Sequence, residues 1–199
     1  MIVLEKPRLC DIGAMQEMIK AEVESGVILP RSDDEIATYI RSYTLAYVCD
    51  EACAKPENTE PKFDSANLGA NSSEISNQNS QICASYTQYF AQKPQNAELA
   101  GYASLKIFNA DLAEIRSFVV SPKFRRRGIG SKIVKALLDE AKFYGLKNVF
   151  ALTYQKHFFE QNGFKEISKD ELPAQKIWAD CISCKKFPVC NEVAVIYTL

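Results

Sequence analysis

The sequence predicts an α+β domain with one mixed central sheet flanked by helices. Three observations support this class: helical periodicity near the start, strand-like segments in the middle, and a strand–helix–strand order near the end. With 199 residues, of which 47% are hydrophobic and 25% charged, the chain is long enough for one well-buried domain. We therefore expect a single domain over residues 1–199.

The first part of the chain predicts a short strand and two helices. Residues 2–8 have the character of a strand. Asp11 is placed to cap a helix in which Ile12, Met15, Ile19 and Val23 form one apolar face, and Gly26 ends it. The run 32–35 (Ser-Asp-Asp-Glu) is a capping box, which predicts the start of a second helix.

Three strands are predicted next, at 45–49, 99–108 and 112–120, and the last two are joined as a hairpin. Between the first and second lies a stretch, at about 51–98, that is rich in Asn, Ser, Gln and Pro and lacks periodicity. We expect a flexible insertion there that folding does not require. Its aromatic patch 86–90 either packs locally or touches a partner.

The last third alternates helices with strands. The predicted elements are a helix at 131–144, a strand at 148–152, a helix at 156–162 closed by Gly163, a strand from 164 to 167, a partly helical segment at 168–184 and a final strand at 192–199.

The net charge of −1 and the pI near 6.0 give no general attraction to nucleic acid or anionic lipid. No apolar run is long enough to cross a bilayer, and Glu5 and Lys6 cut short the apolar opening residues, so we expect a cytoplasmic protein. An odd number of cysteines, seven, favours reduced thiols over a disulfide framework. A homodimer is compatible with the sequence.

A basic, glycine-containing loop between the strand ending at Val120 and the following helix predicts a pyrophosphate site. Glycine lets the backbone approach a ligand, and the free N–H groups of a first helical turn attract an anion. The loop has neither the Gly-Lys-Ser/Thr of a Walker motif nor the three glycines of a dinucleotide fingerprint. The residues expected at this site are Arg125, Arg126, Arg127, Gly128, Ile129, Gly130 and Ser131.

Arg-x-x-Gly-x-Gly after a strand resembles the acetyl-CoA loop of the GNAT N-acetyltransferases, and 158–164 resembles their late helix-to-strand signature. The segments 28–32, 113–117, 150–154 and 172–184 together resemble the short single-domain bacterial N-acetylglutamate synthases. The resemblance implies a GNAT fold, acetyl-CoA as co-substrate, and acetyl transfer to the α-amine of L-glutamate, the first step of arginine biosynthesis. The alternatives are another amine acceptor (a protein N-terminus, lysine or a small amine) and a non-catalytic acyl-CoA-binding module.

Acetyl transfer to an amine needs a base, because the amine of an amino acid is mostly protonated near neutral pH. Glu114 matches the position where GNAT enzymes often place this base; the alternative is a structural carboxylate paired with Arg116 or Lys106. The strand residues Phe118, Val119 and Val120 are expected to splay from their neighbour and offer backbone groups to the pantetheine arm and the acetyl carbonyl. A backbone N–H of Val119 or Val120 would be the oxyanion donor.

Arg31 is the predicted carboxylate-binding residue, because a guanidinium binds a carboxylate through two parallel hydrogen bonds. The alternative is that neighbouring carboxylates at 33–35 neutralise it on the surface. The synthase resemblance places Leu29 and Ser117 against glutamate. Lys176 is a weaker candidate for the second positive charge, as an exposed helix lysine.

The departing thiolate needs a proton or a hydrogen-bond donor. Many GNAT enzymes use a tyrosine where this chain has Phe159, and a phenyl ring donates no proton. The synthase resemblance implies that Thr153 orients or protonates the departing sulfur, with Tyr154 in reserve.

The histidine, three of the cysteines and the tryptophan are expected to have structural roles. The single histidine, His157, is expected at a surface or capping position. Cys181, Cys184 and Cys190 have a spacing that could share one zinc, with Asp180 or the remote Cys10 as the fourth ligand. Because no fourth ligand is obvious, we expect no metal and buried, apolar thiols. Trp178 is expected to anchor its segment by packing on the domain.

Overall fold

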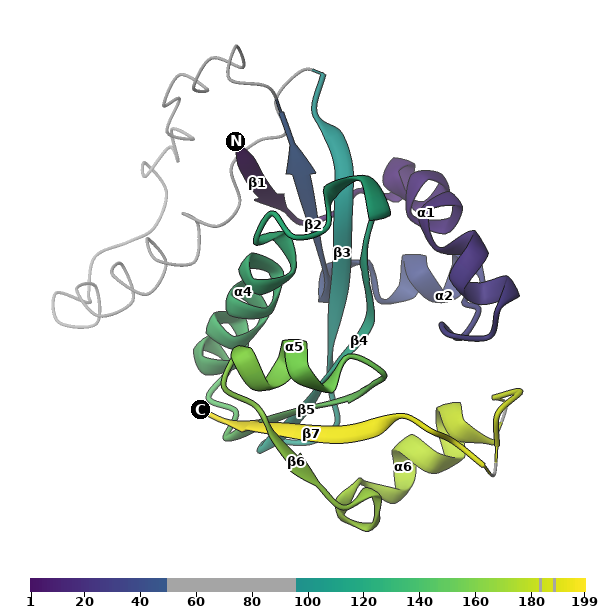
Figure 1. The fold of residues 1–199 in the computed structure, drawn as a ribbon, viewed down its shortest axis with the longest axis vertical. Helices are drawn as coiled ribbons and strands as arrows, with labels where there is room; N and C mark the ends of the chain where they lie inside the picture. Colours follow the sequence, from purple (N-terminus) through teal and green to yellow (C-terminus); the bar gives the residue numbers. More distant parts are fainter. Residues whose placement is uncertain (50–95, 183, 188) are drawn as a thin grey trace, which may run out of the picture.

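The computed structural model describes residues 1–49, 96–182, 184–187 and 189–199. In this part of the chain seven strands form one mixed sheet in the order β1-β2-β3-β4-β5-β7-β6, with helices on both faces (Figure 1). The strands are β1 (Ile2–Glu5), β2 (Tyr43–Val48), β3 (Glu98–Ile107), β4 (Leu112–Val120), β5 (Asn148–Thr153), β6 (Lys165–Ile167) and β7 (Val193–Thr198). The helices are α1 (Ile12–Glu24), α2 (Asp33–Thr38), α4 (Ile129–Phe143), α5 (Lys156–Gln161) and α6 (Ala174–Lys176).

The first four strands form an antiparallel meander. β2 and β3 pair from Tyr43 opposite Ser104 to Val48 opposite Glu98, so the segment between them leaves and rejoins the sheet at adjacent strands. That geometry agrees with an excursion from one hairpin. The predicted insertion lies outside the described residues except for 96–98, and its aromatic patch 86–90 lies wholly outside them.

Two apolar cores lie on opposite faces of the sheet, because successive strand residues point to opposite sides. On β2, Ala46 belongs to the core under α4, whereas Leu45 and Tyr47 belong to the core under α1 and α2. The Ser32 side chain accepts a hydrogen bond from the Glu35 amide and Glu35 reciprocates, so the predicted capping box is confirmed. It fixes the start of α2 beside the first core-facing residue of that helix, Ile36.

The central strands diverge where the chain passes from β4 to the basic loop. β4 and β5 are parallel neighbours only from Leu112 to Glu114, although β4 continues to Val120. On its other side β4 contains a bulge opposite β3, and Ser117 there has a φ of 52°. The predicted splay of residues 118–120 is therefore observed, and it opens a cleft between the two strands.

The predicted packing role of Trp178 is wrong: its side chain is 74% exposed. It lies on a π-helical turn, Ile177–Cys181, that follows α6 directly. The buried positions beside it are charged ones, Lys176 and Asp180. These residues face the interior, and the indole is left on the outer side of the turn.

Gly101 predicts a stability effect that can be measured. A Cβ at this position of β3 would lie 2.6 Å from the backbone oxygen of Val119, so Gly101→Ala must push β3 and β4 apart. We expect the free energy of unfolding in urea to fall by about 1–3 kcal/mol. Gly13→Ala in α1 is the control, since nothing lies within 4 Å of its Cβ and alanine favours a helix. Equal losses in the two variants would contradict the steric explanation.

Candidate active site

A cleft of about 700 Å³ lies where β4 and β5 diverge. Its walls come from the segment between α1 and α2, the outer half of β4, the basic loop, the end of β5 and the region after α6. Most residues predicted for the site line it: Leu29, Arg31, Glu114, Ser117, Phe118, Val119, Val120, Arg125, Arg126, Gly128, Ile129, Gly130, Ser131, Thr153 and Lys176.

One end of the cleft is the basic loop. Gly128 precedes α4 with a φ of 76°, a left-handed conformation that favours glycine, and the helix begins directly after it. The first-turn N–H groups and the positive dipole end of α4 therefore face this end of the cleft. Arg125 is held at the rim by donating from Nε to the Val120 carbonyl at 3.1 Å.

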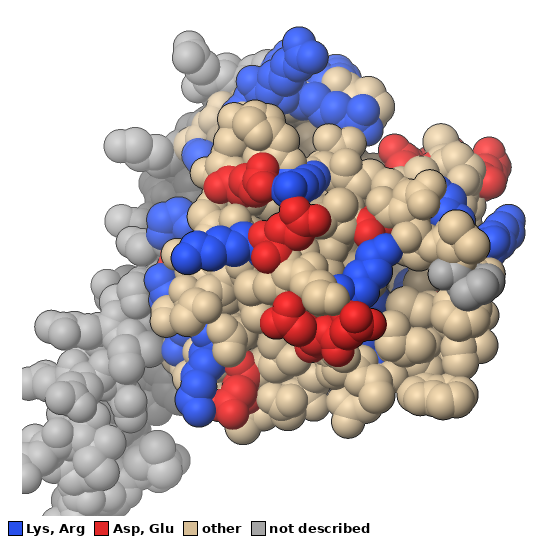
Figure 2. Space-filling model, turned by 60° about the horizontal axis from the view of Figure 1, so that its bottom comes forward, with Lys and Arg blue, Asp and Glu red and all other residues tan. Residues whose placement is uncertain are grey.

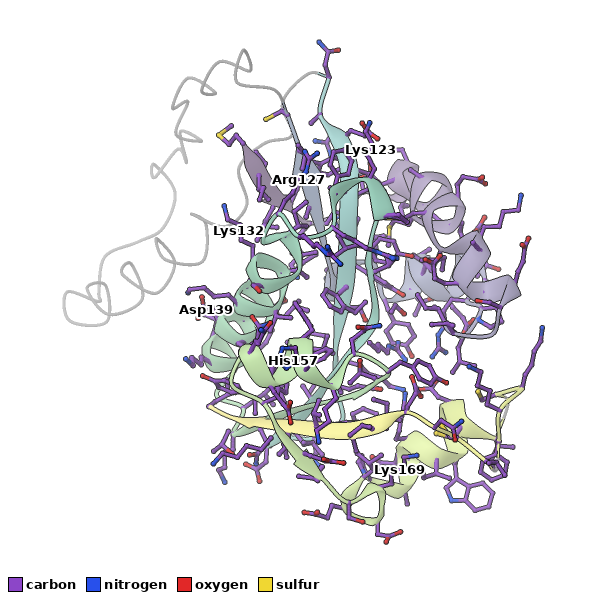
Figure 3. The ribbon with its side chains drawn as sticks, viewed as in Figure 1. Lys123, Arg127, Lys132, Asp139, His157 and Lys169 are labelled. Carbon is purple, nitrogen blue, oxygen red and sulfur yellow. The ribbon has the colours of Figure 1, made fainter. Side chains whose placement is uncertain are left out.

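Two further residues of the loop lie apart from the cleft walls. Lys123 and Arg127, labelled in Figure 3, stack their charged groups on the ring of Phe124, 5.0 and 5.4 Å from its centroid. Arg127 is the one predicted site residue that does not line the cleft. Gly130 allows the start of α4 to approach the Phe158 ring closely, because a Cβ there would lie 3.0 Å from that ring.

Glu114 and Lys176 form a buried ion pair near the other end. The Lys176 ammonium lies 2.5 Å from Glu114 Oε1, and both side chains are less than a tenth exposed. The expectation of an exposed Lys176 is therefore wrong. Arg116 and Lys106 were the partners considered for Glu114, but Lys176 is the residue that it contacts most closely. The short α6 turns Lys176 inward, where an unpaired ammonium would be costly and Glu114 neutralises it.

Asp180 is the centre of a charged cluster that the sequence did not reveal. Its carboxylate forms a short contact with Arg31, lies 3.1 Å from Lys176 Nζ, and lies 3.8 Å from both Lys106 and Arg116. Only the spacing of four from Lys176 could have indicated one of these contacts. The other three cations come from β3, β4 and the segment before α2, which only the fold brings together.

Three buried polar atoms of this cluster have no hydrogen-bond partner among the described residues: Nε of Arg31, Nε of Arg116 and Oε2 of Glu114. All three residues line the cleft. Buried polar groups are normally paired, so these atoms are candidates for contact with a ligand. Two guanidinium donors fit carboxylate oxygens, and one carboxylate oxygen fits an amine.

Burial and neighbouring charges shift the pKa values of the residues in this cluster. Burial raises the pKa of the Glu114 carboxyl, against the opposing effect of Lys176. Burial lowers the pKa of Lys176, but the charges of Glu114 and Asp180 outweigh it and raise the pKa overall. Burial also acts to raise the pKa of Asp180, yet Lys176 and Arg31 hold it well below its usual range. Asp180 therefore stays ionised near neutral pH, whereas Glu114 is suited to gain and lose a proton.

Polar groups at the end of β5 face the middle of the cleft. Thr153 Oγ1 accepts a hydrogen bond from the Gln155 amide at 2.9 Å, which leaves its own hydrogen available to a ligand. Tyr154 also lines the cleft, and its hydroxyl accepts from Lys186 Nζ at 3.0 Å. Phe159 is buried against Phe118, in agreement with a packing role.

The structure confirms the prediction for the single histidine and corrects the one for the cysteines. His157 on α5 is exposed and contacts Gln161, as expected for a surface position (Figure 3). Cys181, Cys184 and Cys190 are half-exposed and line the cleft, so the prediction of buried apolar thiols is wrong. Within the described ranges, no group of three or more His, Cys, Asp or Glu side chains is arranged to hold a metal ion.

Two observations concern larger partners. None of the helices in the described part of the chain is both long and apolar enough to cross a membrane. The face shown in Figure 2 carries acidic and basic side chains interspersed, in keeping with the net charge of −1. That face therefore offers a polyanion no uniform basic field.

Comparison with known protein families matches residues 52–164 to the acetyltransferase (GNAT) family. An uncharacterized N-acetyltransferase of Chlorobaculum tepidum is 41% identical over 105 residues, which cover 51% of this chain and 65% of that protein. An amino-acid acetyltransferase of Mycobacterium tuberculosis is 37% identical over 78 residues, which cover 39% of this chain and 45% of that protein. The chain thus spans less than two thirds of the length of these relatives.

Solved structures show the same fold. The N-acetylglutamate synthase of Neisseria gonorrhoeae, complexed with coenzyme A and N-acetyl-glutamate, has a TM-score of 0.68 at 20% identity; the match covers 100% of this chain and 35% of that one. Rv2747 of Mycobacterium tuberculosis, solved with CoA and NLQ, has a TM-score of 0.62 at 18% identity and is covered over 99% of both chains. The predicted mixed sheet with flanking helices is therefore confirmed as the GNAT fold.

Proposed function

The chain belongs to the acetyltransferase (GNAT) family, and from that premise we propose that it transfers the acetyl group of acetyl-CoA to the α-amine of L-glutamate. This is the reaction of an N-acetylglutamate synthase, the first step of arginine biosynthesis. The names of the amino-acid acetyltransferase relatives and of the Neisseria structure support the proposal.

The net charge of the residues around Asp180 supports glutamate as the acceptor. Among the described residues, four cations (Arg31, Lys106, Arg116 and Lys176) face three carboxylates (Glu114, Asp180 and Glu35), which leaves one positive charge. Glutamate has two carboxylates and one ammonium, so it brings one negative charge and neutralises the cluster. A polyamine would add positive charge, and an amino acid with a neutral side chain would leave the surplus in place.

The unpaired atoms supply contacts for each group of this acceptor. Nε of Arg31 and of Arg116 would bind carboxylate oxygens, and Oε2 of Glu114 would bind the ammonium. Leu29 and Ser117 also line the cleft and would complete the acceptor site. The first turn of α4 and the basic loop would hold the pyrophosphate of acetyl-CoA at the other end.

Acetyl transfer then follows from these positions. Glu114 takes a proton from the ammonium, and the free amine attacks the thioester carbonyl, forming the C–N bond. A backbone N–H of Val119 or Val120, on the part of β4 that is not paired with β5, stabilises the oxyanion. The C–S bond breaks, and the thiolate leaves with Thr153 as its hydrogen-bond donor. The new amide nitrogen gives up its extra proton, and the thiolate takes up a proton to leave as CoA thiol.

The direct test is release of CoA thiol from acetyl-CoA by the full chain, with each amino acid offered in turn. We expect turnover with glutamate well above that with glutamine or alanine, because neither of these supplies the second carboxylate. Turnover with another amine and none with glutamate would mean that this other amine is the acceptor. Acetyl-CoA binding without release for any small amine would point to a macromolecular acceptor or to a non-catalytic binding module.

Arg31→Ala should raise the KM for glutamate about 10–100-fold while the KM for acetyl-CoA stays within about threefold. The reason is that Arg31 belongs to the acceptor end of the cleft, away from the basic loop. The matched control is Arg8→Ala, whose guanidinium forms an exposed pair with Glu5. Equal effects on both substrates would contradict the assigned role of Arg31.

A further inference from the structure

Cys181 and Cys184 lie together at the mouth of the cleft. Both are half-exposed and both line it. The Cys184 amide donates a hydrogen bond to the Cys181 carbonyl at 3.0 Å, which closes a turn between them. In such a turn the two Cα atoms lie less than about 7 Å apart, which is within the span that a disulfide bridges.

The surroundings distinguish the two thiols. The Lys186 amide points at Cys184 Sγ, at 3.5 Å, and the side chain of Lys186 extends to Tyr154 beside the cleft. Burial raises the pKa of the Cys181 thiol, which slows its attack on an oxidant.

We propose that Cys181 and Cys184 form a thiol–disulfide switch that controls the acceptor end of the cleft. The oxidant is a low-molecular-weight disulfide. Cys184 thiolate attacks one of its sulfurs, which forms a mixed disulfide and releases one thiolate. Cys181 then loses its proton and attacks Cys184 Sγ, which forms the intramolecular S–S bond and releases the second thiolate. The two cysteines are oxidised to a protein disulfide, and the low-molecular-weight disulfide is reduced to two thiols.

The position of Cys181 couples this bond to the site. It is the last residue of the π-helical turn Ile177–Cys181, and the residue before it is Asp180, which holds the four cations. A disulfide restrains the end of this turn and shifts Asp180 relative to Arg31. The consequence for activity rests on the proposed function, because it assumes that this cluster binds the acceptor. Formation of the disulfide itself does not depend on the proposed function.

Trypsin offers a direct test of the bond. Cleavage after Lys176 and Lys185 yields the peptide 177–185, which contains Cys181 and Cys184 and no other cysteine. After the full chain is incubated with oxidised glutathione and then alkylated, we expect this peptide to lack two hydrogen atoms and to carry no alkyl group. Dithiothreitol should restore two alkylation sites. Alkylation of both cysteines after oxidation, or a cross-link from this peptide to Cys190, would overturn the proposal.

Activity gives the second test. Oxidation should lower kcat/KM for glutamate about tenfold in the wild type, reversibly, and leave the KM for acetyl-CoA within about threefold. Cys184→Ser should not respond to the oxidant, whereas Cys10→Ser, at an exposed position outside the cleft, should respond like the wild type. The oxidised and reduced wild type suffice if a variant misfolds. A disulfide that forms without changing turnover would overturn the switch. If glutamate is not an acceptor, the peptide still reports the bond.

Discussion

Glu114→Gln should lower kcat for acetyl transfer about 10²–10⁴-fold, the contribution expected of a positioned general base. The side chain is buried, and one of its carboxylate oxygens has no hydrogen-bond partner among the described residues. Glu114 lines the cleft and is the last residue of β4 that pairs with β5. Glutamine keeps the shape of the side chain but cannot accept the proton of the acceptor amine. The KM for acetyl-CoA should change little, because the basic loop is at the other end of the cleft.

The pH profile of the wild type provides a second readout of the same role. Protonated Glu114 cannot act as a base, so kcat/KM should fall as the pH drops through its pKa. Because burial raises that pKa, this acid limb should lie at a higher pH than an ordinary glutamate would give. Glu114→Gln should lose the limb together with the rate. An acid limb at the usual carboxylate position would argue against Glu114 as the base.

Glu140→Gln is the matched control. Glu140 is also a buried carboxylate paired with a lysine, Lys6, at 2.8 Å, but it lies on α4 and does not line the cleft. Its replacement costs a buried ion pair and should affect stability, while the folded enzyme keeps its kcat. Comparable losses of kcat in the two variants would show that a buried carboxylate in general, and not Glu114 in particular, is required.

The strands, the main helices and the basic loop could be predicted because their signals are local. Alternating or helical periodicity marks each element, and the capping box at Ser32 and the glycines of the loop mark boundaries. The splay of β4 from β5 was expected from the family resemblance, and the pairing that stops at Glu114 bears it out.

The charged cluster could not be predicted in the same way. Lys176 is the last residue of a three-residue helix, which is too short for an amphipathic pattern to show which side faces inward. Its burial depends on the distant strand residue Glu114. Asp180 contacts cations from three other parts of the chain. Trp178 is expected from the sequence to pack on the domain, but charged residues fill the inner positions of that turn. Contacts between residues far apart in sequence decide all three cases.

Asp180→Asn should lower the free energy of unfolding by about 3–5 kcal/mol at neutral pH, the usual cost of removing one partner from a buried ion pair. Four cations lie within 4 Å of this carboxylate in the described structure, and asparagine leaves them with only Glu114 and Glu35 as counter-ions. Urea unfolding measures the difference. The control is Asp111→Asn, an exposed pair with Lys147, for which we expect less than about 1 kcal/mol.

The pH dependence of that difference separates charge from shape. The pKa of Asp180 is lower in the folded protein than in the unfolded chain, so its ionised form stabilises the fold above the ordinary carboxyl pKa. This stabilisation is lost as the pH falls through that value toward the folded pKa. The gap between wild type and Asp180→Asn should therefore be widest at neutral pH and narrow below about pH 4. A gap that stays constant across this range would mean that asparagine disturbs packing, and that the charge of Asp180 is not what holds the cluster together.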